Sequence, residues 1–174
     1  MILPPTFTSD GKNIHVVIET PRGNSNKFTY IPGNDFFKIT KALPAGMVFP
    51  WDFGFIPGTK GEDGDPLDVL VLMGPGACTG CVVECRLAGV ITAEQTQKGH
   101  TERNDRIIAI SNEHDAYAHM HSIHDINKNF IDEIGSFFRN YNALAGNKFE
   151  VLGIEGPAKT WALIKEQQAQ TKQD

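Results

Sequence analysis

Short apolar runs alternate with clusters of turn-forming residues over the first 110 residues of the chain. The runs are rich in β-branched and aromatic side chains and have the length of β-strands. Clusters of Gly, Pro, Asn and Asp separate them, for example at 32–35 and 74–76, and such clusters mark turns. We therefore predict strands at 14–19, 27–31, 36–39, 67–73, 82–91 and 106–110.

The last third of the chain changes to a helical period. After Asp125, a candidate helix cap, apolar residues recur at three- and four-residue spacings with polar residues between them. These apolar positions are Ile126, Phe130, Ile134, Phe137, Phe138 and Tyr141. We expect an amphipathic helix that ends near Gly146, a short strand at 148–154, and a second helix opened by Pro157.

Many short strands followed by two helices indicate an α+β chain, mainly β. They predict a closed or nearly closed antiparallel β-barrel, OB-like in plan, with flanking C-terminal helices. A length of 174 residues with 40% hydrophobic content suits one core, so we expect a single domain over residues 1–174.

The hydrophobic runs also bear on the cellular compartment. The longest, at 69–73, is far shorter than the roughly 20 residues of a membrane span. The N-terminus shows no basic region followed by an apolar stretch, as a secretory leader would. The expectation is a cytoplasmic protein with no membrane partner.

The charge balance narrows the class of ligand. Sixteen basic and 21 acidic side chains give a formal net charge of −5, which disfavours a nucleic-acid partner whose phosphates would have to be neutralised. A phosphate ligand stays compatible, because acidic residues can hold metal ions and the metal ions can hold phosphates.

The densest candidate chemistry lies in the segment 63–68, Asp-Gly-Asp-Pro-Leu-Asp. Mg²⁺ prefers oxygen ligands and keeps several waters, so one or two carboxylates for each ion suffice, and this segment offers three. Its Gly and Pro turn the backbone tightly, which lets neighbouring side chains converge.

A solvated acidic turn is the plain alternative for this segment. It is disfavoured because Asp68 directly precedes the apolar run Val69 to Leu72, and an acid at the border of a buried strand needs a partner. An EF-hand is excluded, since a loop that starts at Asp63 has Asp68 at its sixth position and Gly74 at its twelfth, where Gly and Glu are required.

With its flanks, the segment 63–68 resembles the signature of the family I soluble inorganic pyrophosphatases. Blocks on both sides match the family in order, and the resemblance covers roughly residues 14 to 165. The blocks are 16–21, Lys27 and 49–57 before the signature, and 85–90, 106–110, 137–141 and Lys148 after it. The resemblance implies Mg²⁺-dependent hydrolysis of inorganic pyrophosphate to two phosphates by a metal-activated water, with Mn²⁺ or another divalent cation as substitute. It also implies a homo-oligomer, often a hexamer.

Carried over by position, the resemblance implies roles for individual residues. Asp63, Asp65 and Asp68 would ligate metal, and Asp65 would also accept a proton from the attacking water. Glu19 would support the cluster of metal and water. The residues expected to contact phosphate oxygens are Lys27, Lys41, Arg106 and Tyr141.

The chain also departs from the family pattern. Thr29 stands where the family has an acid, Lys41 where it has Arg, Phe49 and Phe53 where it has Tyr, and Asn142 where it has Lys. Two further metal-binding aspartates lack clean equivalents, and Asp105 and Glu94 are the candidates to replace them. Each lost buried hydrogen bond costs about 1–3 kcal/mol, so we expect lower activity or a shifted substrate preference with the same class of chemistry.

Two other functions compete with pyrophosphate hydrolysis. One is a phosphohydrolase of the same fold that acts on a short polyphosphate or a nucleotide ester. The other is a non-catalytic barrel that binds phosphate metabolites or oligonucleotides. The net charge of −5 and the lack of a basic aromatic stripe count against the second.

Two clusters of potential metal ligands have plainer interpretations. Cys78, Cys81 and Cys85 have a C-x2-C-x3-C spacing, but a strand through the last of them separates their side chains, so we expect buried structural thiols. Four histidines between 114 and 124 fit no zinc spacing, and we expect them at the surface or at the entry to the helix.

Overall fold

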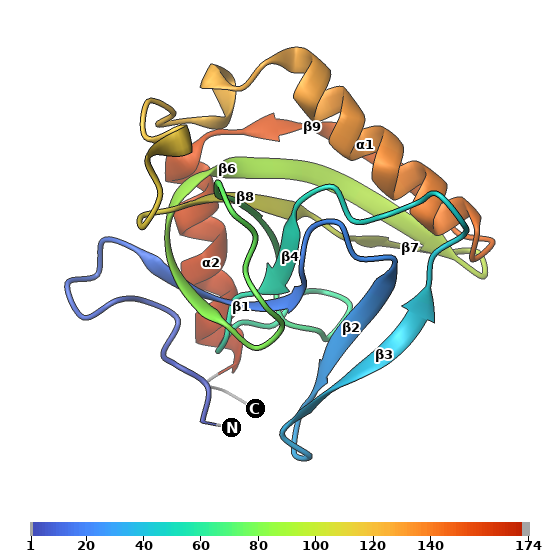
Figure 1. Cartoon of the computed structure of the whole chain (residues 1–174), viewed down its shortest axis with the longest axis horizontal. Helices are drawn as coiled ribbons and strands as arrows, with labels where there is room; N and C mark the ends of the chain where they lie inside the picture. Colours follow the sequence, from blue (N-terminus) through green and yellow to red (C-terminus); the bar gives the residue numbers. More distant parts are fainter. Residues whose placement is uncertain (1, 172–174) are drawn as a thin grey trace.

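Five strands close into a barrel in the computed structural model, which describes residues 2–171 (Figure 1). They are β1 (Ile14–Thr20), β4 (Asp52–Phe55), β5 (Asp68–Leu72), β8 (Arg106–Ser111) and β6 (Val82–Gln97). The sheet order β1-β4-β5-β8-β6 returns to β1 through pairing of β1 with β6. The β-barrel predicted from the sequence is thus confirmed.

Strands β5 and β8 are buried over nearly their whole length. Their alternate residues enter two different hydrophobic clusters, as the two-residue period of a strand requires. Leu70 and Leu72 pack in one cluster with Ile134 and Phe138, whereas Val69 and Val71 pack in the other with Ile164. Apolar residues on both faces explain why these strands read as continuous hydrophobic runs.

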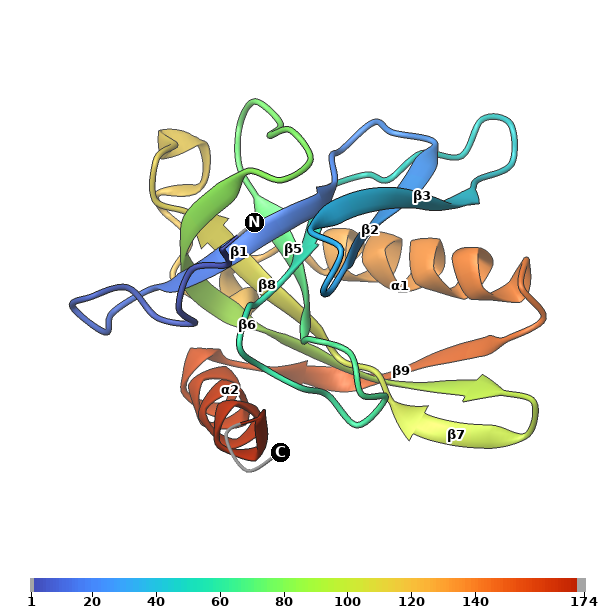
Figure 2. The ribbon, with the colours of Figure 1, turned by 90° about the horizontal axis from the view of Figure 1, so that it is seen from below.

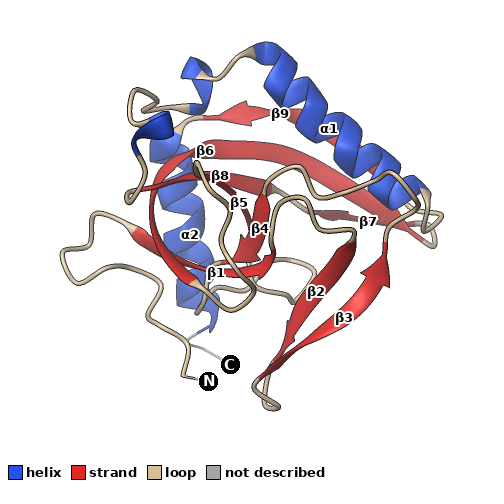
Figure 3. Cartoon of the chain, in the orientation of Figure 1, coloured by secondary structure: helices blue, strands red, loops and turns tan. Residues whose placement is uncertain are grey.

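Two helices cover the barrel on different sides (Figure 3). Helix α1 (Lys128–Ala143) supplies the apolar face that belongs to the first cluster, and α2 (Pro157–Thr171) supplies Ile164 to the second. Between them runs β9 (Lys148–Glu155), which pairs with β6 along its whole length. Two 3₁₀ turns, η1 (Asp115–Tyr117) and η2 (Ile123–Asp125), lead into α1.

Two hairpins extend beyond the ring (Figure 2). Strands β2 (Asn26–Ile31) and β3 (Phe36–Ala42) form a separate two-stranded sheet. The far half of β6 pairs with β7 (His100–Arg103). Both hairpins contribute side chains to the site described below.

The structure corrects several local predictions. Strands β4 and β7 lie where none was predicted, and β6 runs six residues further than 82–91. The side chain of Asn127 caps α1, whereas Asp125 completes a capping box with Ser122 in the preceding turn. One strand pair of the ring, β5 with β8, is parallel, which the expected antiparallel barrel did not include. Among the described residues, no helix is long and apolar enough to cross a membrane.

Candidate active site

The acidic segment forms a tight loop that ends in β5. The Gly61 N–H donates to the Asp65 carbonyl at 2.7 Å, and Gly64, at φ +85°, donates to the Gly61 carbonyl at 3.1 Å. The Asp65 N–H donates to Asp63 Oδ1 at 3.1 Å. A left-handed conformation at Gly64 is one that glycine adopts without strain, so this residue makes the turn feasible. The loop thereby fixes Asp63, Asp65 and Asp68 along one rim of the barrel.

Glu19 lies beside these carboxylates at the end of β1. It is 6% exposed, and its Oε1 accepts the Tyr30 N–H at 2.7 Å. Burial raises the pKa of Glu19 to about 7, and the negative charges of Asp68 and Asp65 act in the same direction. The pKa of Asp63 is also raised, first by partial burial of its carboxyl group and then by Asp68 and Asp65. Burial, and then the neighbouring carboxylates, therefore favour the protonated form of these two groups.

Arg106 is the main basic partner of this acidic rim. Its Nη1 lies 2.7 Å from Asp68 Oδ2, and the side chain is only 5% exposed. Because β5 and β8 are parallel and Asp68 and Arg106 begin them, the two residues lie at the same edge of the barrel. The guanidinium stacks 4.7 Å from the ring of Phe138, and Nη1 also donates to the side-chain oxygen of Asn104.

The β2–β3 hairpin places two lysines opposite the acidic loop. Lys27 and Lys41 are cross-strand partners in its register. The Lys41 ammonium lies 3.9 Å from the centre of the Tyr141 ring and donates to the Tyr141 carbonyl at 3.1 Å, which links the hairpin to α1. Burial, and next the charge of Lys27, lowers the pKa of Lys41. The Lys27 ammonium lies 5.4 Å above the ring of Phe53.

One cavity of about 680 Å³ collects most of the predicted site residues. Its lining includes Asp63, Asp65, Asp68, Lys27, Lys41, Arg106 and Tyr141. The β6–β7 hairpin forms another part of the wall with Lys98, His100, Glu102 and Arg103. Glu19 lines a smaller adjoining cavity together with Asp65, Asp68 and Lys27. Seven predicted residues from separate parts of the sequence thus share one space, and Glu19 lies next to it.

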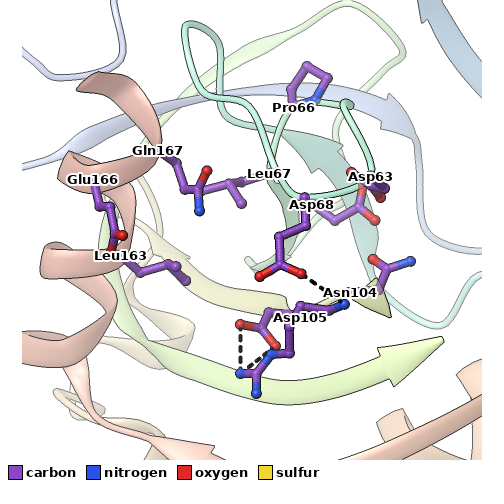
Figure 4. Close-up of a pocket in the computed structure, with 12 residues that line it drawn as sticks. Asp63, Pro66, Leu67, Asp68, Asn104, Asp105, Leu163, Glu166 and Gln167 are labelled. Carbon is purple, nitrogen blue, oxygen red and sulfur yellow. Dashed lines mark hydrogen bonds and ion pairs between the residues drawn. The ribbon is translucent and has the colours of Figure 1, made fainter. Parts of the chain in front are cut away.

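Asp105 lies outside this cavity. It lines a neighbouring cavity of about 310 Å³ that Asp63 and Asp68 also line, and Figure 4 shows Asp68 and Asp105 across from the α2 side chains Leu163, Glu166 and Gln167. The Asp105 carboxylate forms an ion pair with Arg103 at 3.0 Å and accepts a hydrogen bond from the Ala93 N–H at 2.9 Å. Its role as a metal ligand stays a prediction, and Glu94, the other candidate, lines none of these three cavities.

The residues that depart from the family pattern have identifiable structural roles. Phe49 and Phe53 are buried in the first hydrophobic cluster, as expected for core residues. Asn142 is 4% exposed and donates to the Phe138 carbonyl one turn earlier in α1. The Thr29 hydroxyl lies 2.8 Å from that of Thr40 across the β2–β3 hairpin.

Asn104 is a site residue that the sequence did not single out. Its side-chain oxygen accepts a hydrogen bond from Arg106 Nη1. Its side-chain amide group donates to the side-chain oxygen of Gln95 at 2.9 Å. Asn104 thus connects Arg106 to β6. An Asn two residues before an Arg at a strand start carries no distinctive pattern, so only the tertiary arrangement reveals this contact.

The other two clusters are only partly as predicted. Cys85 is buried, but Cys78 is exposed and Cys81 is only half-buried, so the prediction of buried thiols is confirmed for Cys85 alone. The histidines between 114 and 124 lie in and around the 3₁₀ turns that precede α1, and most are exposed. This confirms their placement at the helix entry.

The donor set of the acidic rim suits a divalent cation. Across residues 2–171, no three Asp, Glu, His or Cys side chains already converge closely enough to surround one ion. Mg²⁺ does not require such a cage, because it keeps several waters and takes one or two carboxylates. The raised pKa values of Glu19 and Asp63 indicate carboxylates that a cation would stabilise in their charged form.

Comparison with known proteins agrees with this geometry. The family model described as inorganic pyrophosphatase matches residues 16–172. The chain belongs to the inorganic pyrophosphatase family. The inorganic pyrophosphatase of Thermus thermophilus is 36% identical over 156 residues, which are 90% of this chain and 87% of that protein. That of Halalkalibacterium halodurans is 34% identical over 89% of this chain and 93% of its own length.

Solved pyrophosphatase structures share the fold. The crystal structure of the inorganic pyrophosphatase from Thermus thermophilus superposes with a TM-score of 0.88 at 32% identity and covers 97% of both chains. The OB-like barrel with two C-terminal helices is therefore the fold of this family in the present chain as well. Family membership also makes dependence on a divalent metal the general expectation for the inorganic pyrophosphatase site.

Proposed function

We propose that this protein hydrolyses inorganic pyrophosphate to two phosphate ions, with Mg²⁺ as the preferred cation. The observation that carries the proposal is the cavity of about 680 Å³, where three carboxylates of one loop face basic groups from four other elements. A ligand that bridges such a cavity must combine a cation for the carboxylates with an anion for the lysines and arginines. A metal complex of pyrophosphate has both.

The roles that we assign to the residues are those that the family resemblance implies, and their positions in the structure are compatible with them. Asp63, Asp65 and Asp68 would hold the divalent cations, which supply a bound water of lowered pKa and neutralise phosphate charge. Asp65 would accept the proton of the attacking water, and Glu19 would orient water beside it. Lys27, Lys41, Arg106 and the Tyr141 hydroxyl would bind phosphate oxygens and so place the phosphorus for in-line attack.

A short linear polyphosphate is the second candidate substrate. Besides Lys27 and Lys41, the cavity lining includes three basic residues of the β6–β7 hairpin, Lys98, His100 and Arg103, together with the acid Glu102. A longer polyanion could use these additional charges, whereas pyrophosphate spans only part of the cavity.

Phosphate release decides between these substrates. Pyrophosphate, tripolyphosphate and a nucleoside triphosphate should each be supplied with Mg²⁺ and with Mn²⁺, and pyrophosphate with Mg²⁺ should be hydrolysed fastest. If tripolyphosphate were faster, the second candidate would replace the first. If pyrophosphate were the slowest, the proposed function would be wrong.

A single variant tests the proposed mechanism. Asp65→Asn keeps the size of the side chain but removes its basicity, so it should lower the rate of phosphate release at least about 100-fold. Asp115→Asn, at an exposed acid in η1, is the matched control and should keep the wild-type rate. Unchanged phosphate release by Asp65→Asn with metal binding retained would refute the catalytic assignment and favour a binding barrel.

We further propose that the protein works in the cytoplasm as a homo-oligomer, the hexamer being the arrangement that the family resemblance implies. Large apolar side chains exposed in the single chain, such as Ile39 at 54% and Leu152 at 49%, are available for contacts between copies. Light scattering coupled to gel filtration measures the molar mass directly, and a mass equal to one chain of 19.2 kDa would contradict the oligomer.

A further inference from the structure

A four-residue turn before β6 brings two thiols together at the surface. The Cys81 N–H donates to the Cys78 carbonyl at 3.1 Å, and Gly80 adopts a φ of +88° within the turn. The two Sγ atoms lie 2.6 Å apart. Cys78 is exposed and Cys81 is half-buried, so a reagent in solution can reach the first sulfur.

The same turn is bonded to the strand that carries Glu19. The Gly80 N–H donates to the Ile18 carbonyl at 2.8 Å, and the Ile18 N–H donates to the Cys81 carbonyl at 2.9 Å. The Thr79 hydroxyl donates to the Glu19 carbonyl at 2.9 Å. Three hydrogen bonds therefore connect the turn to the end of β1.

We propose that Cys78 and Cys81 are a reversible dithiol–disulfide pair, oxidised by low-molecular-weight disulfides, which stiffens the end of β1 beside the acidic rim. The proposal concerns thiol chemistry that pyrophosphate hydrolysis does not use, so it stands apart from the proposed function. The sulfurs are already adjacent, and bond formation requires only a small movement of the two side chains.

The exchange is balanced without any further reactant. The exposed Cys78 thiolate attacks one sulfur of a disulfide RSSR, which forms a mixed disulfide and releases one RS⁻. The Cys81 thiolate then attacks the Cys78 sulfur, which forms the intramolecular bond and releases the second RS⁻. The protein loses two electrons and two protons, RSSR gains both, and the products are the protein disulfide and two RSH.

Cys85 serves as an internal reference. Its side chain is fully buried, and its Sγ contacts the Val83 carbonyl at 3.8 Å. Burial raises the pKa of the Cys85 thiol and also shields its sulfur from reagents in solution, whereas the hydrogen bond with Cys81 raises the pKa of the exposed Cys78 thiol without closing access to it. A native protein exposed to RSSR should therefore react at two thiols and keep the third.

The test uses the intact chain in glutathione disulfide and, for reversal, in dithiothreitol. Mass spectrometry with thiol alkylation should show loss of two hydrogen atoms and one remaining thiol, Cys85, in the oxidised protein. Hydrogen exchange at the amides of Ile18 and Gly80 should slow roughly tenfold on oxidation, with amides of β8 as the reference. Cys78→Ser and Cys81→Ser should show neither effect.

Each result has a definite meaning. A stable glutathione adduct, or a disulfide between two copies of the chain, in place of the intramolecular bond would refute the pair. An intramolecular bond that left exchange at Ile18 and Gly80 unchanged would refute its coupling to β1. Phosphate release is not a readout here, so failure of the proposed function would leave the outcome unaffected.

Discussion

Arg106 carries an unusual share of the contacts at the acidic rim. Its Nη1 bonds Asp68, the Asn104 side chain and the Asp105 carbonyl, while its guanidinium carbon lies over the Phe138 ring. A planar guanidinium can stack and bond at the same time, whereas an ammonium group has a compact head with no flat face.

The Arg106→Lys variant should therefore be less stable by about 1–3 kcal/mol, because several half-buried acceptors lose their donor. Urea unfolding measures this free energy. Arg103→Lys is the matched control, since the Arg103 side chain is 40% exposed in its ion pair with Asp105 and should cost less than about 1 kcal/mol. An equal decrease in the free energy of unfolding in the two variants would contradict the proposed role of Arg106.

Glu19 gives the metal-free protein a defined dependence on pH. The pKa of Glu19 is about 7 in the folded chain and 4.5 when unperturbed, so the folded state binds more protons between these values. Stability conferred by the protonated group is present below pH 4.5 and is lost as the pH rises toward 7.

Without divalent cations, Glu19→Gln should accordingly become more stable than the wild type as the pH approaches neutrality, by up to about 3 kcal/mol. Thermal melting of both proteins from acidic to neutral pH measures the difference. Adding Mg²⁺ should narrow it, because a cation stabilises the wild-type carboxylate. A difference in melting temperature between the two proteins that stayed constant at all pH values would show that Glu19 does not titrate in this range.

Site residues were predictable from the sequence only where they form a local pattern. The acidic motif was recognisable because three carboxylates in one short segment are a local pattern, and its neighbours along the chain supported it. The contacts of Arg106 with Asn104 and Phe138 depend on how β7, β8 and α1 pack, which no local pattern encodes. Only the position of Asp105 along the chain suggests a metal ligand, whereas in the structure its carboxylate contacts Arg103 and the Ala93 N–H.

At the scale of elements, β4 shows how closely two strands can approach. It pairs with β1, with Gly54 opposite Ile18. A Cβ atom at Gly54 would collide with the Val17 carbonyl oxygen, a backbone atom that cannot move aside without disturbing β1. Glycine at this position lets the barrel close directly beside Glu19.

Gly54→Ala should lower the free energy of unfolding by about 3 kcal/mol or more, since the added methyl group overlaps backbone atoms. Gly153→Ala is the control, because its Cβ would meet only the Thr92 hydroxyl at an ordinary 3.6 Å. It should change stability by less than about 1 kcal/mol. Chemical denaturation of both variants provides the comparison, and a neutral Gly54→Ala would mean that β1 and β4 can separate freely.

The elements that sequence patterns failed to predict share a physical cause. Strand β4 has four residues, one of them Gly and another Asp, so no alternation is visible. Strand β7 is His-Thr-Glu-Arg, which is polar on both faces because it extends beyond the barrel. Long apolar strands such as β8 and the amphipathic α1 were predictable because the core requires their periodicity.

For the molecule as a whole, the closed ring predicts one cooperative unfolding transition. Within the ring, each strand is hydrogen-bonded to two other ring strands. Both helices pack on the two hydrophobic clusters to which these strands contribute. Opening one strand pair therefore exposes core on either side. The single domain inferred from the sequence remains a prediction, and this transition tests it.

Near- and far-ultraviolet circular dichroism should report the same midpoint in urea, as expected for a two-state domain of this size. Intrinsic fluorescence of Trp51, which packs against the first cluster, and Trp161, which packs against the second, gives a third probe. Separate midpoints for these signals would indicate two independent folding units. Measurements at several protein concentrations distinguish dissociation of copies from unfolding within one chain.

Strand β6 pairs with β1, β7, β8 and β9, and this has a consequence for synthesis on the ribosome. A nascent chain that has emerged as far as Leu72 can pair β1 with β4 and β4 with β5, but this sheet has two open edges. Open edges invite pairing with other chains. Both are satisfied only after β6 and then β8 have emerged, so the nascent protein should be most prone to pairing with other chains while the segment from Leu72 to Ser111 is leaving the ribosome.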